Sequence, residues 1–132
     1  MDKPKSGSEL KPAATVLRKS RGKLGEDLAC ATLANSGVRI LARNFRCKIG
    51  EIDVVGLVGD TLVFVEVRSR SRSDLGLPAE SVGYKKQQKL RKIAVYYLIV
   101  ADKVNAPCRF DVVSIVYGRA NEAAVDWIVN AF

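Results

Sequence analysis

Residues 50 to 68 carry most of the structural information in this chain: Gly50-Glu-Ile-Asp-Val-Val-Gly-Leu-Val-Gly-Asp-Thr-Leu-Val-Phe-Val-Glu-Val-Arg68. Two apolar, β-branched runs flank Gly59-Asp60, which is a typical two-residue hairpin turn. With that turn, Asp53 lies directly opposite Glu66, and their Cβ atoms are roughly 4.5–5.5 Å apart. Two carboxylates this close repel each other unless one is protonated or a cation lies between them. The segment therefore predicts a hairpin with a divalent metal site, since such ions prefer oxygen ligands.

The same register places a second charged pair beside the acidic one. Glu51 lies opposite Arg68, on the same face as Asp53 and Glu66, because residues two apart in a strand share a face. The alternative interpretation is a solvated charge cluster in which cross-strand pairs neutralise each other. Glu51 and Arg68 fit that interpretation, whereas two opposed carboxylates do not.

The composition predicts one small basic domain. The chain has 132 residues, with 22 Lys and Arg against 14 Asp and Glu, and a formal net charge of +8. A domain of this kind often binds a polyanion, most commonly nucleic acid. The alternative is a soluble basic protein without such a partner.

The residue types exclude several kinds of chemistry. Histidine is absent, which removes Ser-His-Asp and Cys-His catalysis and His-ligated metals. The three cysteines form no CxxC pair, so neither a zinc site nor a disulfide framework is expected. The apolar run 93–101 is too short to cross a bilayer, and no signal peptide precedes the domain. We therefore expect a reduced, cytoplasmic protein without membrane contact.

The pattern along the chain predicts an α/β order of elements. Residues 1–18 resemble a flexible basic arm, and residues 19–132 form the domain. Helix becomes plausible from Ser20 and stops at Asn35-Ser36-Gly37. Strands are expected at 38–47, 51–58 and 61–69, followed by a polar loop at 69–78. A helix starting between 78 and 84 and ending near 100, a strand at 109–117 and a short edge strand at 125–129 complete the chain.

The central strands carry apolar residues on both faces. Alternation places Ile52, Val54 and Val58 on one side of the second strand, with Val55 and Leu57 on the other. A sheet that is apolar on both faces is usually covered by helices on both sides. The sequence thus predicts an α/β sandwich around a mixed sheet, whose long helix makes a parallel, right-handed crossover.

Basic side chains gather near the acidic pair. They are Arg68, Arg70 and Arg72 at the end of the third strand, and Lys85, Lys86, Lys89 and Lys92 in the long helix. The alternative for the helix is an ordinary solvated face. Because few acidic residues accompany these cations, nucleic-acid binding is favoured.

Four motifs together resemble a known family. They are Gly25-Glu26, Gly50-Glu-Ile-Asp-Val-Val55, Val63-Phe-Val-Glu-Val-Arg68 and Arg109-Phe-Asp-Val-Val113. Over about residues 18–132 the chain resembles the small YraN-like bacterial family, which is uncharacterised and is predicted to belong to the PD-(D/E)xK nuclease superfamily. The core is also similar to archaeal Holliday junction resolvases. The resemblance implies a three-layer α/β/α restriction-endonuclease-like fold with a central mixed sheet.

The resemblance also implies roles for individual residues. Asp53 and Glu66 match two ligands of Mg²⁺ (or Mn²⁺), and Glu26 matches a third, although it also fits an ordinary acid near a helix start. Arg68 stands where the superfamily has Lys. Arginine can hold a phosphate, but its pKa lies above ~12 and it cannot act as a base.

Two further residues match the family less specifically. Gln87 corresponds to a polar residue that faces the site from a helix in related nucleases. Asp111 lies in the Arg-Phe-Asp motif, where a structural pairing with Arg109 is at least as plausible. Trp127 has no spacing beyond that of core residues, so packing is expected.

The sequence thus leads to one main hypothesis and two alternatives. The main one is a metal-dependent endonuclease that hydrolyses DNA, with a structure-dependent substrate such as branched or single-stranded DNA by analogy only. The alternatives are a catalytically inactive nucleic-acid-binding module and an adaptor of a DNA-processing complex. By analogy with resolvases a homodimer is compatible with a branched substrate.

Overall fold

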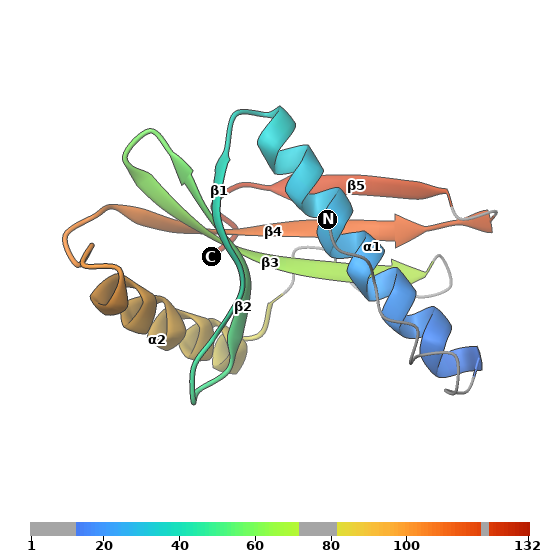
Figure 1. Cartoon of the computed structure of the whole chain (residues 1–132), viewed down its shortest axis with the longest axis horizontal. Helices are drawn as coiled ribbons and strands as arrows, with labels where there is room; N and C mark the ends of the chain where they lie inside the picture. The colour runs from blue at the N-terminus through green and yellow to red at the C-terminus, as the bar shows by residue number, and fades with distance from the viewer. Residues whose placement is uncertain (1–12, 72–81, 120–121) are drawn as a thin grey trace, which may run out of the picture.

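The protein forms a mixed five-stranded sheet with two helices, an α/β fold (Figure 1). The computed structural model describes the backbone of residues 13–71, 82–119 and 122–132, with side chains from residue 22 onward. The elements are α1 (Ala13–Asn35), β1 (Arg39–Arg46), β2 (Glu51–Val58), β3 (Thr61–Ser71), α2 (Tyr84–Val100), β4 (Cys108–Tyr117) and β5 (Ala123–Ile128). Strand order in the sheet follows the sequence, from β1 to β5. Only β3 and β4 are parallel among these strands, as expected for the pair that α2 connects.

Two apolar clusters lie on opposite faces of the sheet. Leu62 and Phe64 of β3 pack with Ile93 of α2, whereas Val63 and Val65 belong to the cluster that contains Ala29 and Leu33 of α1. Neighbouring strand residues point to opposite faces, so each helix covers its own face. The expectation of helices on both sides is confirmed.

The central hairpin has the predicted turn and register. Gly59 has a φ of 58°, a conformation that glycine adopts without strain, and β2 pairs with β3 from Val58–Thr61 to Val54–Val65. Turn chemistry therefore set the register correctly. The recorded pairing ends at Val54–Val65, so the expected direct opposition of Asp53 and Glu66 is not part of the ladder.

The expected faces of β2 are wrong at one residue. Ile52 packs in the same cluster as Val55, on the α2 side, while Val54 faces α1. The neighbouring strand β1 is irregular at the same level, because Asn44 has a φ of 54° between the pairs Arg43–Val54 and Phe45–Ile52. A left-handed residue interrupts strict alternation, so the face changes at Asp53.

Element ends differ modestly from the predictions. The helix α1 begins at Ala13 instead of Ser20, because the segment 13–19 consists mainly of good helix formers. Residues 1–12 of the expected arm lie outside the described residues. The strand β3 continues to Ser71, and β5 begins at Ala123. Within the described ranges, neither helix is long and apolar enough to span a membrane.

Candidate metal and phosphate site

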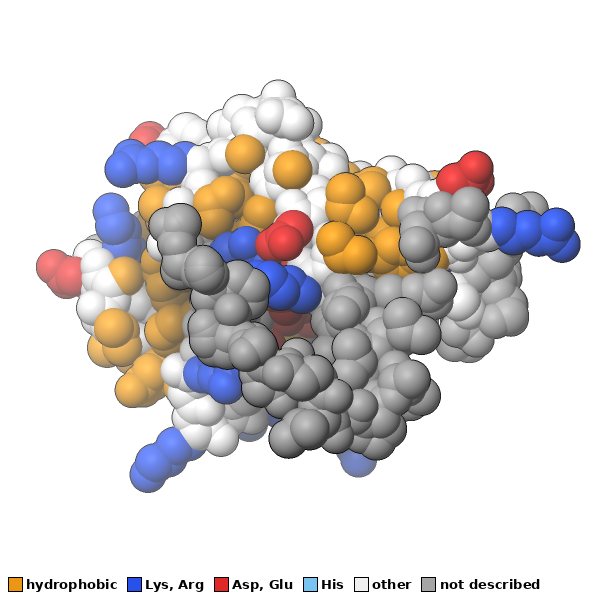
Figure 2. Space-filling model, turned by 45° about the vertical axis from the view of Figure 1, so that its right-hand side comes forward, with side chains coloured by type: hydrophobic (Ala, Val, Ile, Leu, Met, Phe, Trp, Pro, Cys, Tyr) orange, Lys and Arg blue, Asp and Glu red, His pale blue; other side chains and the backbone are white. Residues whose placement is uncertain are grey.

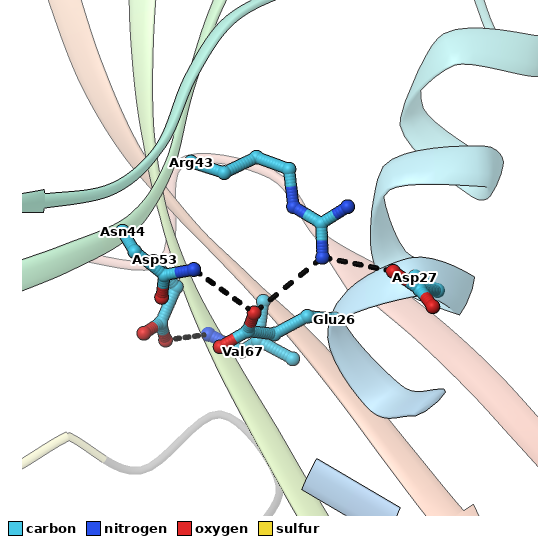
Figure 3. Close-up of polar contacts among 6 residues, drawn as sticks. All are labelled: Glu26, Asp27, Arg43, Asn44, Asp53 and Val67. Atoms are coloured by element: carbon cyan, nitrogen blue, oxygen red, sulfur yellow. Dashed lines mark hydrogen bonds and ion pairs between the residues drawn. The ribbon is translucent and has the colours of Figure 1, made fainter. Parts of the chain in front are cut away.

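Asp53 lies where the ladder between β2 and β3 ends. Its Oδ2 accepts a hydrogen bond from the backbone N–H of Val67 at 2.8 Å, so the carboxylate takes the position of a ladder acceptor (Figure 3). The side chain is half-buried. Asp53 therefore sits in the sheet itself, accessible from the levels of both helices.

Glu26 reaches this position from α1. Its Oε1 accepts hydrogen bonds from Asn44 Nδ2 at 3.2 Å and from Arg43 Nη2 at 3.5 Å (Figure 3). Arg43 also pairs with Asp27 at 2.9 Å. Sequence reasoning overlooked Asn44, although asparagine is among the non-glycine residues that best tolerate a positive φ. Its unusual backbone directs the amide toward Glu26 and opposite Asp53.

Gly25 allows α1 to approach the sheet closely. A Cβ atom at this position would lie 2.3 Å from Ser69 Oγ and 3.4 Å from Ile115 Cδ1. The first distance is too short for any carbon–oxygen contact, so the hydroxyl would have to move. This close approach places the adjacent Glu26 over the sheet.

The contact at Gly25 leads to a testable prediction. Alanine favours helix by about 1 kcal/mol over glycine, but in the wild type the clash with Ser69 Oγ should cancel that gain. In a Ser69→Ala background, Gly25→Ala should stabilise the protein by about 0.5–1 kcal/mol. Thermal unfolding of the four proteins measures this coupling. Equal effects of Gly25→Ala in both backgrounds would contradict it.

Glu66 points toward α2. Its Oε2 lies 2.6 Å from Lys86 Nζ, and its side chain is 11% exposed, against 55% for Lys86. Alternation along β3 explains the direction, because Leu62 and Phe64 face α2 as well. We had placed Lys86 in a stripe that binds DNA, whereas the structure brings it to the acidic pair.

The environment of Asp53 disfavours its charge. Burial is the largest cause, and together with the nearby charges of Glu66, Glu26 and Glu51 it raises the pKa of Asp53 from 3.8 to about 7. The hydrogen bond from Val67 opposes the shift. A carboxyl that titrates near neutrality beside other carboxylates indicates an excess of negative charge that a cation would relieve.

The carboxylates fit a divalent ion as a pair. In the described part of the chain, no three acidic or cysteine side chains stand close enough to form a ready-made metal site. Mg²⁺ is usually held by one or two carboxylates, with waters and substrate phosphates as its other ligands. Asp53 and Glu66 meet that requirement, and Glu26 lies on the α1 side as a further oxygen ligand.

Glu51 does not follow its predicted pairing with Arg68. Its Oε1 pairs with Arg46 Nε at 2.8 Å, because Arg46 and Glu51 are partners across the β1–β2 hairpin. The backbones of Cys47 and Gly50 close that hairpin through two hydrogen bonds. The turn after β1 thus determines the partner of Glu51.

The basic residues surround this position unevenly. A hollow of about 390 Å³ lies beside the acidic pair, lined by Glu51, Lys85, Lys86, Lys89, Leu90 and Ile93. Arg68 and Arg70 are half-buried on β3, on the face of Glu66 by alternation, and Lys92 is exposed. Arg72 lies outside the described residues. Acidic and basic side chains lie together near the centre of one face of the molecule (Figure 2).

Gln87 and Asp111 have structural partners. Gln87 Nε2 donates a hydrogen bond to the Val82 carbonyl at 2.7 Å and so braces the start of α2. Asp111 pairs with Arg109 at 3.0 Å, which confirms the structural interpretation. Trp127 packs in the α1-side cluster as expected and also donates to Asp111 Oδ2 at 2.9 Å.

Comparison with known proteins gives a consistent family. The model described as "Uncharacterised protein family UPF0102" matches residues 25–115. A UPF0102 protein of Moorella thermoacetica is 47% identical over 119 residues, covering 89% of this chain and 99% of that protein. A relative from Clostridioides difficile is 42% identical over 86% of this chain and 97% of its own length. One from Syntrophus aciditrophicus is 48% identical over 84% of this chain and 87% of its own.

Proposed function

Because the chain belongs to the uncharacterised family UPF0102, the YraN-like family of the sequence motifs, we propose its function from the site: it is a metal-dependent endonuclease that hydrolyses phosphodiester bonds in DNA. The observation that carries the proposal is Asp53, a half-buried carboxyl whose pKa is raised to about 7 next to Glu66 and Glu26. We propose further that the sheet and its two helices form the three-layer arrangement of restriction-endonuclease-like proteins. The strands β2 and β3 would then present the acidic pair in the way the PD-(D/E)xK motif requires.

Each residue has a role in this proposal. Asp53 and Glu66 would hold Mg²⁺ or Mn²⁺, with Glu26 alongside. A bound divalent ion supplies Lewis-acid polarisation of the scissile phosphate and lowers the pKa of an attacking water. Arg68 orients the phosphate and offsets its charge in the transition state.

The hydrolysis itself needs no other reactant than water. The water oxygen forms a bond to phosphorus while the bond from phosphorus to the leaving nucleotide oxygen breaks. One proton of the water passes to solvent, and the leaving oxygen takes up a proton. The side chains of Lys85, Lys89 and Lys92, with Arg70 and Arg72, hold the flanking phosphates, which makes binding dependent on salt.

One observation favours a second candidate, a nucleic-acid-binding module without catalysis. Lys86 neutralises Glu66 at 2.6 Å in the protein without metal, and Arg68 occupies the place of the superfamily lysine. Such a module would use the same basic hollow to bind DNA. It differs from the endonuclease in having no need for a divalent ion.

Cleavage assays distinguish these functions. The full chain is incubated with Mg²⁺ or Mn²⁺ and a panel of branched, nicked and single-stranded DNAs. We expect cutting of at least one substrate, and a loss of about 100-fold or more in Asp53→Ala and Glu66→Gln. Asp60→Ala, in the exposed turn of the same hairpin, is the matched control and should cut normally.

The same assays define the failure of each function. No cutting, together with metal binding that Asp53→Ala leaves unchanged, would refute the endonuclease. Salt-sensitive DNA binding without cutting would then support the binding module. Absence of DNA binding even at low salt would favour an adaptor that acts through protein contacts.

A further inference from the structure

Lys86 is distinguished from its basic neighbours by its contact with the acidic pair. Its Nζ lies 2.6 Å from Glu66 Oε2. Lys85 and Lys89 line the same hollow but form no ion pair with a carboxylate in the described part of the chain. Lys86 therefore belongs both to the hollow and to the carboxylates, and it lies where a phosphate bound in one would approach the other.

The three carboxylates have different protein partners in the absence of metal. Glu26 is held by Asn44 and Arg43, and Asp53 by the backbone N–H of Val67. Lys86 is the partner of Glu66. A divalent ion at Asp53 and Glu66 would meet the ammonium group at the same oxygen atoms, so the two cations repel each other.

We infer that Lys86 is a further catalytic residue, which moves from Glu66 to the scissile phosphate when a divalent ion binds; this inference rests on the proposed endonuclease function. An ammonium carries three donors on a flexible stem, and the side chain of Lys86 is 55% exposed, so it has room to turn. It supplies, from α2, the lysine contact that the β3 position lacks because Arg68 stands there. In its contact with phosphate it offsets the negative charge that grows in the transition state.

This role predicts two effects of opposite sign for Lys86→Gln. Loss of the competing ammonium should tighten binding of Mn²⁺ in the absence of DNA by about threefold to tenfold. Loss of its phosphate contact should slow cleavage at saturating DNA by about 100-fold. A lysine that only binds the DNA backbone would change neither quantity.

The experiment compares Lys86→Gln with Lys86→Arg and with the neighbouring control Lys85→Gln. Mn²⁺ affinity is measured by calorimetry on the full chain without DNA, and cleavage by single-turnover kinetics at saturating DNA. Lys86→Arg keeps the charge and should return Mn²⁺ affinity to the wild-type value. Lys85→Gln should weaken DNA binding while it leaves Mn²⁺ affinity and the single-turnover rate unchanged. Circular dichroism confirms that each variant is folded.

The outcomes separate this inference from the function on which it rests. If Lys86→Gln behaves like Lys85→Gln in both Mn²⁺ affinity and cleavage, the inference is overturned and the endonuclease stands. Tighter Mn²⁺ binding with an unchanged rate also overturns the catalytic role. A wild-type protein that neither binds Mn²⁺ nor cuts any DNA overturns the proposed function, and the inference with it.

Discussion

Replacing Asp111 with alanine is expected to destabilise the protein by about 3–5 kcal/mol, the usual effect of removing one partner from a buried charged pair. Asp111 is 0% exposed and its two oxygens accept hydrogen bonds from three separate groups. These are the Arg109 guanidinium, the Trp127 indole at 2.9 Å and the backbone N–H of Asn130 at 2.8 Å. Alanine would leave all three donors without their acceptor, and Arg109 is itself mostly buried, with 24% of its side chain exposed.

Urea unfolding of Asp111→Ala and Asp126→Ala tests this expectation. Asp126 is the matched control, because it lies on the neighbouring strand β5 and is exposed. Its replacement should change the free energy of unfolding by less than about 0.5 kcal/mol. A loss of under about 1 kcal/mol for Asp111→Ala would mean that water replaces the carboxylate and that its contacts are not needed for the fold.

Local signals in the sequence were sufficient for the sheet and its helices. The Gly59-Asp60 turn fixed the β2–β3 register, since a glycine at positive φ suits a tight hairpin. The apolar spacing of α2 correctly predicted which residues it buries, including Leu90, Ile93 and Ala94. Both signals depend only on residues close together in the chain.

The geometry of the candidate site depended on contacts that local patterns do not contain. Asp53 and Glu66 do approach each other electrostatically, but Asp53 faces the Val67 amide instead of continuing the ladder. Asn44 looked like an ordinary strand residue, because nothing in the alternation signals a positive φ. The pairing of Lys86 with Glu66 requires the packing of α2 on the sheet, which no spacing in the sequence specifies.

Replacing Asp53 with asparagine is expected to stabilise the protein while it abolishes metal binding. The pKa of Asp53 is about 7 in the folded protein, against an ordinary value of 3.8. Between these values the folded state keeps a proton that the unfolded state has released, so wild-type stability falls as pH rises toward 7. Asparagine carries no charge to bury, and its side-chain oxygen can still accept the Val67 hydrogen bond.

The size of this gain should depend on pH. We expect Asp53→Asn to exceed the wild type in free energy of unfolding at pH 8, and by about 2 kcal/mol more than at pH 5. Urea unfolding in the presence of a chelator measures the difference, with Asp60→Asn in the exposed turn as control. An Asp53→Asn advantage that is the same at both pH values would contradict the raised pKa.

The metal dependence of stability provides the complementary measurement. At pH 8 Mn²⁺ should raise the melting temperature of the wild type, because the ion binds the folded carboxylate pair and not the unfolded chain. In Asp53→Asn that rise should disappear, although the variant is more stable without metal. Since metal and proton compete for Asp53, the rise should also shrink in the wild type as pH falls from 8 to 5. A protein that sacrifices stability to keep a charged Asp53 does so for a ligand, and a Mn²⁺ effect of equal size in both proteins would show that this ligand is not a divalent ion.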